Sequence, residues 1–176
     1  MWDRLRARLL KGARPHGVEP PDPELGPARV LLVCSSGGHL AQIMRLESWW
    51  KRHDRLWVTF NKPDAQSQLA DEPVVWAYHP VTRNVANAVR NLWLAVKVIR
   101  SFRPDVIVSN GAGVAFPFFV FAKVVGVKTV YIEVYDRIDS RTLNGRLCEP
   151  LTDLFLVQWP EQQDLYRKAE LIGPLY

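Results

Sequence analysis

The stretch Val30-Leu31-Leu32-Val33-Cys34-Ser35-Ser36-Gly37-Gly38-His39-Leu40 decides the fold. Its opening run of apolar residues predicts a short strand that is buried on both faces. The two serines and two glycines that follow predict a tight turn. From Leu40 onward the apolar residues recur with helical spacing. The stretch therefore predicts a strand, a glycine turn and the N-terminus of a helix.

The glycine turn is a candidate ligand site. Backbone N–H groups at a helix N-terminus are free to bind an anion, and Gly37 and Gly38 leave the main chain open to phosphate or sugar. Ser35 and Ser36 can cap the helix or donate to a ligand oxygen, and His39 lies in its first turn. The spacing is neither the dinucleotide fingerprint nor a P-loop, which argues against NAD and ATP. The alternative is a turn that only packs helix against strand, with His39 as a capping or surface residue.

Strand and helix patterns alternate along the rest of the chain, which predicts an α/β fold: a Rossmann-like parallel sheet with right-handed crossovers and helices on both faces. In the long predicted helix 84–102, the residues Val85, Val89, Leu92, Val96 and Ile99 share one face. Further strands are expected at 55–60, 74–78, 105–109, 128–134 and 153–157, helices at 40–51, 63–69, 84–102, 114–125, 143–151 and 161–168, and an edge strand within 169–174.

Three loops leave the carboxyl ends of the predicted strands, where parallel sheets bind ligands. The first is the turn Ser35–His39, and the second is Asn110-Gly111-Ala112-Gly113. The third begins with Glu133 and reaches Arg137, so it carries a carboxylate and a guanidinium. We expect the three loops to converge on one site.

Composition divides the chain into a basic helix at 1–14, a Pro-rich linker at 15–27 and one domain at 28–176. The formal net charge is +5. Most of it lies in the first segment, which argues against a nucleic-acid-binding protein, since these spread their basic patch over the folded face. No apolar run is long enough to predict a membrane-spanning helix. Cys34 and Cys148 predict reduced thiols, and no metal-ligand spacing or cofactor motif is present.

The N-terminal helix is amphipathic. Its apolar side carries Trp2, Leu5 and Leu9, and another face carries Arg4, Arg8 and Lys11. This pattern is typical of a helix that lies in the headgroup region of an anionic bilayer. The alternative is a solvated terminus.

The loops, taken in order, resemble one known family. The turns Ser35–His39 and Asn110–Gly113, with Tyr131-Ile132-Glu133, Arg137 and the segments 153–159 and 173–176, are similar to the acceptor-side, membrane-anchoring subunit of two-subunit GT-B glycosyltransferases. This family includes the anchoring subunit of the dolichol-linked N-acetylglucosamine transferase and bacterial exopolysaccharide and capsule homologues. A more distant resemblance is to the N-terminal half of the peptidoglycan N-acetylglucosamine transferase.

The resemblance implies half of an inverting enzyme at the cytoplasmic face of a membrane. A separate donor-binding glycosyltransferase subunit would hold the nucleotide sugar, and this chain would bind a polyprenyl-pyrophosphate-linked acceptor. The pyrophosphate suits the amides of the glycine turns and Arg137. His39 is the first candidate for the base that deprotonates the acceptor hydroxyl, and Glu133 is the second, as a base or as the group that orients His39. The alternatives are an ion pair of Glu133 with Arg137 that only stabilises the fold, a non-catalytic module that anchors and activates a partner, and a stand-alone nucleotide-binding domain.

Overall fold

The computed structural model describes residues 2–3, 6–7, 27–81 and 84–175. Seven parallel strands form one sheet in the order β3-β2-β1-β4-β5-β6-β7, which confirms the predicted fold class. The strands are β1 (Arg29–Val33), β2 (Asp54–Phe60), β3 (Val74–Ala77), β4 (Val106–Ser109), β5 (Lys128–Ile132), β6 (Leu154–Val157) and β7 (Ala169–Leu171). The helices are α2 (Gly38–Met44), α3 (Glu47–Trp50), α4 (Pro63–Gln68), α5 (Val85–Phe102), α6 (Ala115–Val125), α7 (Leu143–Cys148) and α8 (Pro160–Gln163), with a short 3-10 helix η1 (Glu149–Leu151).

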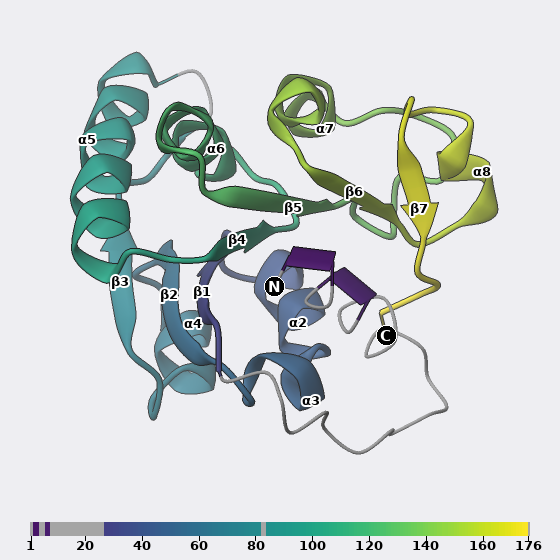
Figure 1. Ribbon diagram of the computed structural model, residues 1–176. Coiled ribbons are helices and arrows are strands. Elements are labelled where there is room, and N and C mark those ends of the chain that lie inside the picture. The colour runs from purple at the N-terminus through teal and green to yellow at the C-terminus, as the bar shows by residue number, and fades with distance from the viewer. Residues whose placement is uncertain (1, 4–5, 8–26, 82–83, 176) are drawn as a thin grey trace.

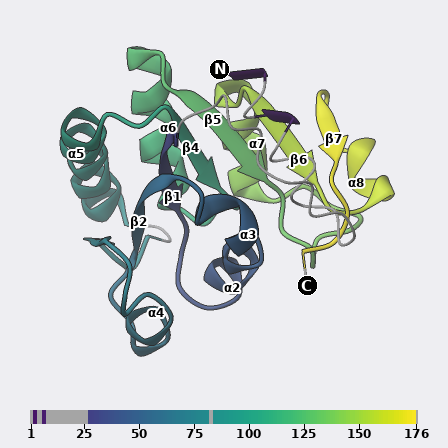
Figure 2. The ribbon, with the colours of Figure 1, turned by 60° about the horizontal axis from the view of Figure 1, so that its bottom comes forward.

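Helices cover both faces of the sheet. Figure 1 shows α5, α6 and α7 on one face and α2, α3 and α4 on the other, and Figure 2 shows the same layers from a second direction. The side chains of β1 alternate between two buried clusters. Val30 and Leu32 pack under α2 and α3, whereas Leu31 and Val33 pack under α5 and α6. Both cysteines are free and buried. The central strand is therefore buried on both faces, as its apolar run predicts.

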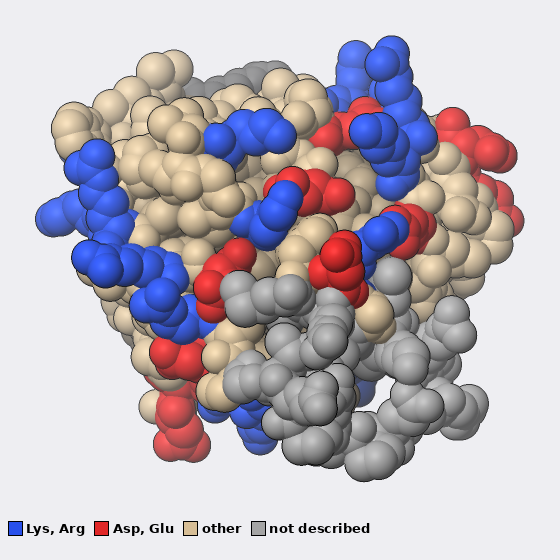
Figure 3. Space-filling view, viewed as in Figure 1, with Lys and Arg blue, Asp and Glu red and all other residues tan. Residues whose placement is uncertain are grey.

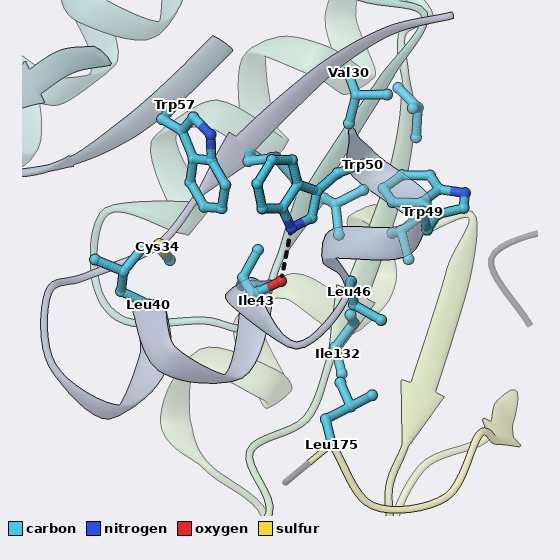
Figure 4. Close-up of a cluster of buried hydrophobic side chains, with 14 of the residues drawn as sticks. Val30, Cys34, Leu40, Ile43, Leu46, Trp49, Trp50, Trp57, Ile132 and Leu175 are labelled. Atoms are coloured by element: carbon cyan, nitrogen blue, oxygen red, sulfur yellow. Dashed lines mark hydrogen bonds between the residues drawn. The ribbon is translucent and has the colours of Figure 1, made fainter. Parts of the chain in front are cut away.

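The expected helix 40–51 is wrong in one respect: it is two helices, α2 and α3, with a break at residues 45–46. Trp49 and Trp50, both in α3, are buried. The indole Nε1 of Trp50 donates to the carbonyl oxygen of Ile43 at 3.2 Å, which satisfies a backbone acceptor near the end of α2 (Figure 4).

Helix α5 buries a different face from the one its apolar stripe suggests. Its buried residues include two asparagines. Asn91 exchanges two hydrogen bonds with the backbone of Tyr78, both at 2.9 Å, and Asn87 donates to the carbonyl oxygen of Pro80. With these amides inside, Val85 and Val89 are exposed.

The C-terminal helices are shorter than predicted. Helix α7 ends at Cys148 and continues as η1, in which Pro150 has no backbone donor to extend an α-helix. The expected helix 161–168 is wrong beyond Gln163, where α8 ends. Beyond it, the ring of Tyr166 stacks on Phe155 with centroids 4.3 Å apart, and the chain turns to place this ring in the core.

Trp2 and Arg6 of the N-terminal segment contact the domain. Trp2 is partly buried against the cluster under α2 and α3, with the Lys128 ammonium 5.5 Å from its ring centroid, and Arg6 forms an ion pair with Glu170 of β7. The other predicted membrane residues of this segment, Arg4, Leu5, Arg8, Leu9 and Lys11, lie outside the described residues, as does most of the linker. Membrane contact by the segment stays a prediction. Among the described residues, no helix has the length and apolarity to cross a bilayer.

Candidate functional site

The three predicted loops meet at one cavity. Its volume is about 190 Å³, below the ~300–1,000 Å³ usual for small-molecule sites. His39 comes from the first loop, Asn110 and Ala112 from the second, and Glu133 and Arg137 from the third. The convergence expected from the sheet topology is therefore present. The remaining lining residues are Tyr131, Val134, Asp136, Thr142 and Asn144.

Two hydrogen bonds between His39 and Asn110 join the loops that follow β1 and β4. The ring Nδ1 of His39 lies 3.1 Å from the carbonyl oxygen of Asn110, and the Asn110 side-chain amide donates to the carbonyl oxygen of His39 at 2.7 Å. A carbonyl oxygen only accepts, so Nδ1 carries the proton and Nε2 keeps its lone pair. Burial lowers the pKa of His39 and favours this neutral form. His39 therefore has the tautomer and charge of a general base, and it does not cap its helix.

The side chain of Asn110 contains a buried acceptor atom. Its side chain is fully buried, yet its Oδ1 has no hydrogen-bond partner within the part of the chain that the structure describes. A buried acceptor without a donor is costly, at about 1–3 kcal/mol. The neighbouring Ala112 has a φ of 59°, a left-handed conformation that is strained for a residue with a side chain. An acceptor of this kind can receive a hydrogen bond from the hydroxyl or amino group of a ligand.

Arg137 supplies the positive charge of the site, and its loop is fixed by Gln162. The side-chain amide of Gln162 donates to the carbonyl oxygens of Val134 and Arg137, at 2.9 and 3.0 Å. Its oxygen accepts from the backbone N–H groups of Gln158 and Trp159. A fully buried glutamine on α8 thus holds the guanidinium-bearing loop beside the cavity.

Glu133 lines the cavity, but its carboxylate forms hydrogen bonds with neighbouring residues of the fold. Its carboxylate accepts from the backbone N–H of Val134 at 3.0 Å, from the Thr142 hydroxyl at 3.1 Å, and from the Tyr166 hydroxyl. Burial raises its pKa, although these hydrogen bonds act in the opposite direction. Among the described residues, no ion pair joins Glu133 to Arg137 and no hydrogen bond joins it to His39. The group that orients His39 is the carbonyl oxygen of Asn110.

The turn before α2 differs from the expected anion cradle. Ser35 donates to the carbonyl oxygen of Ser36 at 3.2 Å, and neither serine caps the helix. The N–H of Gly37 donates to the Asp64 carboxylate at 2.6 Å, so an internal anion already occupies part of the turn. Gly37 needs to be glycine because its φ is 77°. At Gly38 a Cβ would meet no atom within 4 Å, so the structure itself does not require glycine there.

The structure explains why positions 111 and 113 of the second loop are glycines. Gly111 has a φ of 100°, and a Cβ on it would lie 2.6 Å from the Tyr131 hydroxyl oxygen. A Cβ on Gly113 would lie 2.8 Å from Cγ2 of Val81. Both glycines therefore shape the loop that carries Asn110, and neither lines the cavity.

Sequence reasoning missed the residues that complete the site. Thr142 caps α7 by accepting from the N–H of Gly145 at 2.9 Å and also donates to Glu133. A threonine just before a predicted helix was a usable signal for the cap, but nothing local pointed to its second partner. Tyr166 and Gln162 follow β6 and reach the site only through the tertiary fold.

Comparison with known proteins agrees with this architecture. Residues 77–175 match the family described as "Oligosaccharide biosynthesis protein Alg14 like". The rat protein named UDP-N-acetylglucosamine transferase subunit ALG14 is 27% identical over 200 aligned residues, covering 96% of this chain and 91% of the relative. The human protein of the same name is also 27% identical, and the alignment covers 82% of this chain and 81% of the human protein.

Solved structures show the same fold at low identity. MurG of Acinetobacter baumannii superposes with a TM-score of 0.68 at 14% identity, over 84% of this chain and 46% of its own. The UDP-GlcNAc 2-epimerase of Neisseria meningitidis superposes with a TM-score of 0.62 at 13% identity, over 81% of this chain and 46% of its own. This chain thus spans less than half the length of either, and the likeness confirms a Rossmann-like domain of the GT-B type. Because the family match covers more than half of its residues, the chain belongs to the Alg14-like family of oligosaccharide biosynthesis proteins.

Proposed function

We propose that this chain is the acceptor-binding, membrane-recruiting subunit of a heteromeric inverting glycosyltransferase. It would act at the cytoplasmic face of a membrane, on a polyprenyl-pyrophosphate-linked glycan, with a partner subunit that binds the nucleotide sugar. The observation that carries this proposal is His39, held neutral with its Nε2 lone pair free in a cavity that also contains Arg137. The names of the relatives support it, because they are subunits of a UDP-N-acetylglucosamine transferase.

In the proposed reaction, Nε2 of His39 takes the proton of an acceptor hydroxyl as that oxygen attacks the anomeric carbon of the donor sugar. The bond from that carbon to the nucleoside diphosphate breaks, and the diphosphate leaves with the electron pair. The buried Oδ1 of Asn110 suits a second sugar hydroxyl, since it can only accept a hydrogen bond. Arg137 suits the pyrophosphate of the carrier. The small cavity volume supports a site that the partner subunit completes.

The decisive experiment is co-expression of this chain with a donor-binding glycosyltransferase subunit, followed by transfer assays with lipid-linked acceptors and a panel of nucleotide sugars. We expect transfer only when both subunits are present. Tight binding of a nucleotide sugar by this chain alone would instead support a stand-alone nucleotide-binding domain. A complex that stays fully active when His39 is replaced would support a non-catalytic activating module.

Gly38 gives a separate test of the proposed pyrophosphate contact. Because a Cβ there meets no protein atom, we expect Gly38→Ala to leave the protein as stable as before or more stable, by about 0.4–1 kcal/mol. If the diphosphate approaches the main chain at this point, the same methyl group lowers transfer by roughly tenfold, the loss that corresponds to about 1.4 kcal/mol. Thermal unfolding and the transfer assay measure the two effects. Unchanged transfer would remove Gly38 from the site.

A further inference from the structure

The outer surface of α5 and α6 has an unusual composition. Residues 73–132 contain seven basic residues, and Asp105 is their one acidic residue. Neither α5 nor α6 contains an aspartate or glutamate. In Figure 3 the left side of the molecule, over these helices, is tan and blue, whereas red side chains lie over the centre, the right and the lower edge. The surface of these two helices therefore carries basic side chains and no acidic side chain of its own.

The same face carries an exposed apolar stripe. It runs along α5 through Val85, Val89, Leu92 and Trp93, with exposed fractions of 79, 50, 38 and 67%. A tryptophan that is two-thirds exposed, beside three exposed aliphatic side chains, is unfavourable in water. The stripe exists because the opposite face of α5, with Asn87 and Asn91, packs against the β3–α5 connection.

Cations flank the stripe. Arg90 lies beside the exposed Tyr78, with its guanidinium 5.8 Å from the ring centroid. Arg100 lies over Phe121 of α6, 5.7 Å from the ring centroid, so the positive charge continues from α5 onto α6. Lys97 is also exposed on α5. An exposed tryptophan and aliphatic residues, bordered by Lys and Arg without acids, match the headgroup layer of an anionic bilayer in both polarity and charge.

We propose that the α5–α6 face, defined by Val85, Val89, Leu92, Trp93 and the flanking Arg90, Lys97 and Arg100, docks on an anionic lipid bilayer. This surface lies on the face of the sheet opposite to the one against which Trp2 packs, so it is independent of the N-terminal segment. It goes beyond the proposed catalytic site, because it concerns lipid binding by the folded domain itself.

The position of this face fits a lipid-linked substrate. The segment before α5 packs on the second site loop, since Val81 leaves no space for a Cβ on Gly113. Helix α5 begins four residues after Val81, so the stripe starts close to the loop that brings Asn110 to the cavity. A domain docked through α5 holds the cavity near the headgroups, where the diphosphate of a carrier lipid lies.

Vesicle co-sedimentation of the full-length chain tests the proposal. Vesicles of equimolar phosphatidylcholine and phosphatidylglycerol are compared with vesicles of phosphatidylcholine alone. Val89→Glu and Leu171→Glu form a matched pair, because each puts a carboxylate in place of a half-exposed aliphatic residue, on α5 and on the far edge strand β7. The N-terminal segment is the same in every variant, so a difference between two variants comes from the substituted position.

We expect Val89→Glu to reduce partition into the anionic vesicles by roughly fivefold or more, and Val89→Glu/Trp93→Glu by roughly 30-fold or more, because each added charge is repelled about as strongly as one basic residue is attracted. Leu171→Glu should stay within about twofold of wild type, and partition should fall as salt screens the surface charge. Wild-type binding by the double variant, or equal binding of the wild type to both kinds of vesicle, overturns the proposal. So does a double variant that binds vesicles but no longer binds the partner subunit, because the face is then a protein interface.

Failure of this proposal is separable from failure of the proposed function. Transfer to a water-soluble acceptor with a short lipid tail depends on the cavity and the partner subunit, not on the bilayer. If Val89→Glu/Trp93→Glu keeps this transfer but binds vesicles like the wild type, only the membrane face is wrong.

Discussion

Replacing His39 by alanine is expected to lower kcat of the assembled transferase by about 100-fold or more, the usual contribution of a positioned general base. The reason is the arrangement at the mouths of β1 and β4. The carbonyl oxygen of Asn110 fixes the proton on Nδ1, and burial keeps the ring neutral, so Nε2 is available to accept the hydroxyl proton. KM for the acceptor should change much less, because proton transfer occurs in the transition state rather than in substrate binding.

His39→Asn separates catalysis from positioning. The asparagine side-chain nitrogen occupies nearly the place of Nδ1 and can donate to the Asn110 carbonyl oxygen, but it offers no basic lone pair. We therefore expect His39→Asn to be about as inactive as His39→Ala, while its thermal unfolding stays closer to wild type. Steady-state kinetics of the complex with a lipid-linked acceptor measure both variants. Near-normal kcat for His39→Asn would show that the histidine only holds the two loops together.

The pH profile gives a second signature of the same base. Burial lowers the pKa of His39 from its ordinary value of 6.5, and the nearby Asp136 carboxylate acts in the opposite direction. The neutral form is the active one, so kcat should rise with pH through a pKa below 6.5 and then level off. Asp136→Asn removes a negative charge that stabilises the imidazolium, so the acidic limb should move to lower pH. A profile that does not move would place the essential base elsewhere.

The sequence predicted the sheet well because its strands are continuous apolar runs between turn residues. The run at β1 required burial on both faces, and its alternating contacts with the two clusters confirm this. Helix α5 is the element whose buried face its apolar pattern does not predict. Its apolar periodicity located the helix, but a count of apolar residues cannot reveal that Asn87 and Asn91 are satisfied by the backbone of residues 78–80 and can be buried. Only the tertiary contacts decide which stripe faces the core.

The site was predictable to the extent that it follows from topology. Parallel strands end at one edge, and this alone brought His39, Asn110 and Arg137 to one cavity. The role of each side chain depended on partners far away in the sequence. Asp64 of α4 accepts a hydrogen bond from the N–H of Gly37. Tyr166, which follows α8, donates a hydrogen bond to Glu133. No local sequence pattern predicts such contacts.

Replacing Glu133 by alanine is expected to lower the free energy of unfolding by about 3–5 kcal/mol, because the N–H of Val134 and the hydroxyls of Thr142 and Tyr166 lose their acceptor in a buried place. Gly145 shows how closely α7 is fitted to this carboxylate: a Cβ there would collide with Glu133 and Tyr166. Water cannot easily replace the lost acceptor in so tight a space. Urea unfolding of the folded chain measures the loss.

Glu133→Gln is the matched variant, because its amide keeps one oxygen for Val134 and Thr142 and can donate to the Tyr166 oxygen. We expect it to fold, to lose far less stability than Glu133→Ala, and to retain transfer within about tenfold of wild type, since a positioned general base contributes more than that. A stable Glu133→Gln protein whose transfer falls as far as that of His39→Ala would instead make Glu133 the base.

The pH dependence of stability distinguishes the two variants further. Burial raises the pKa of Glu133 in the folded protein above its ordinary value of 4.5, so the folded state binds the proton more tightly than the unfolded chain does. This contribution to stability is fully present below the unfolded pKa and is lost as the pH rises through the folded pKa. Glutamine does not ionise, so the stability of Glu133→Gln relative to wild type should improve as the pH rises from about 4.5 toward neutrality. Equal pH dependence of the two proteins in urea unfolding would mean that the hydrogen bonds from Thr142, Tyr166 and Val134 fully offset the cost of burying the carboxylate.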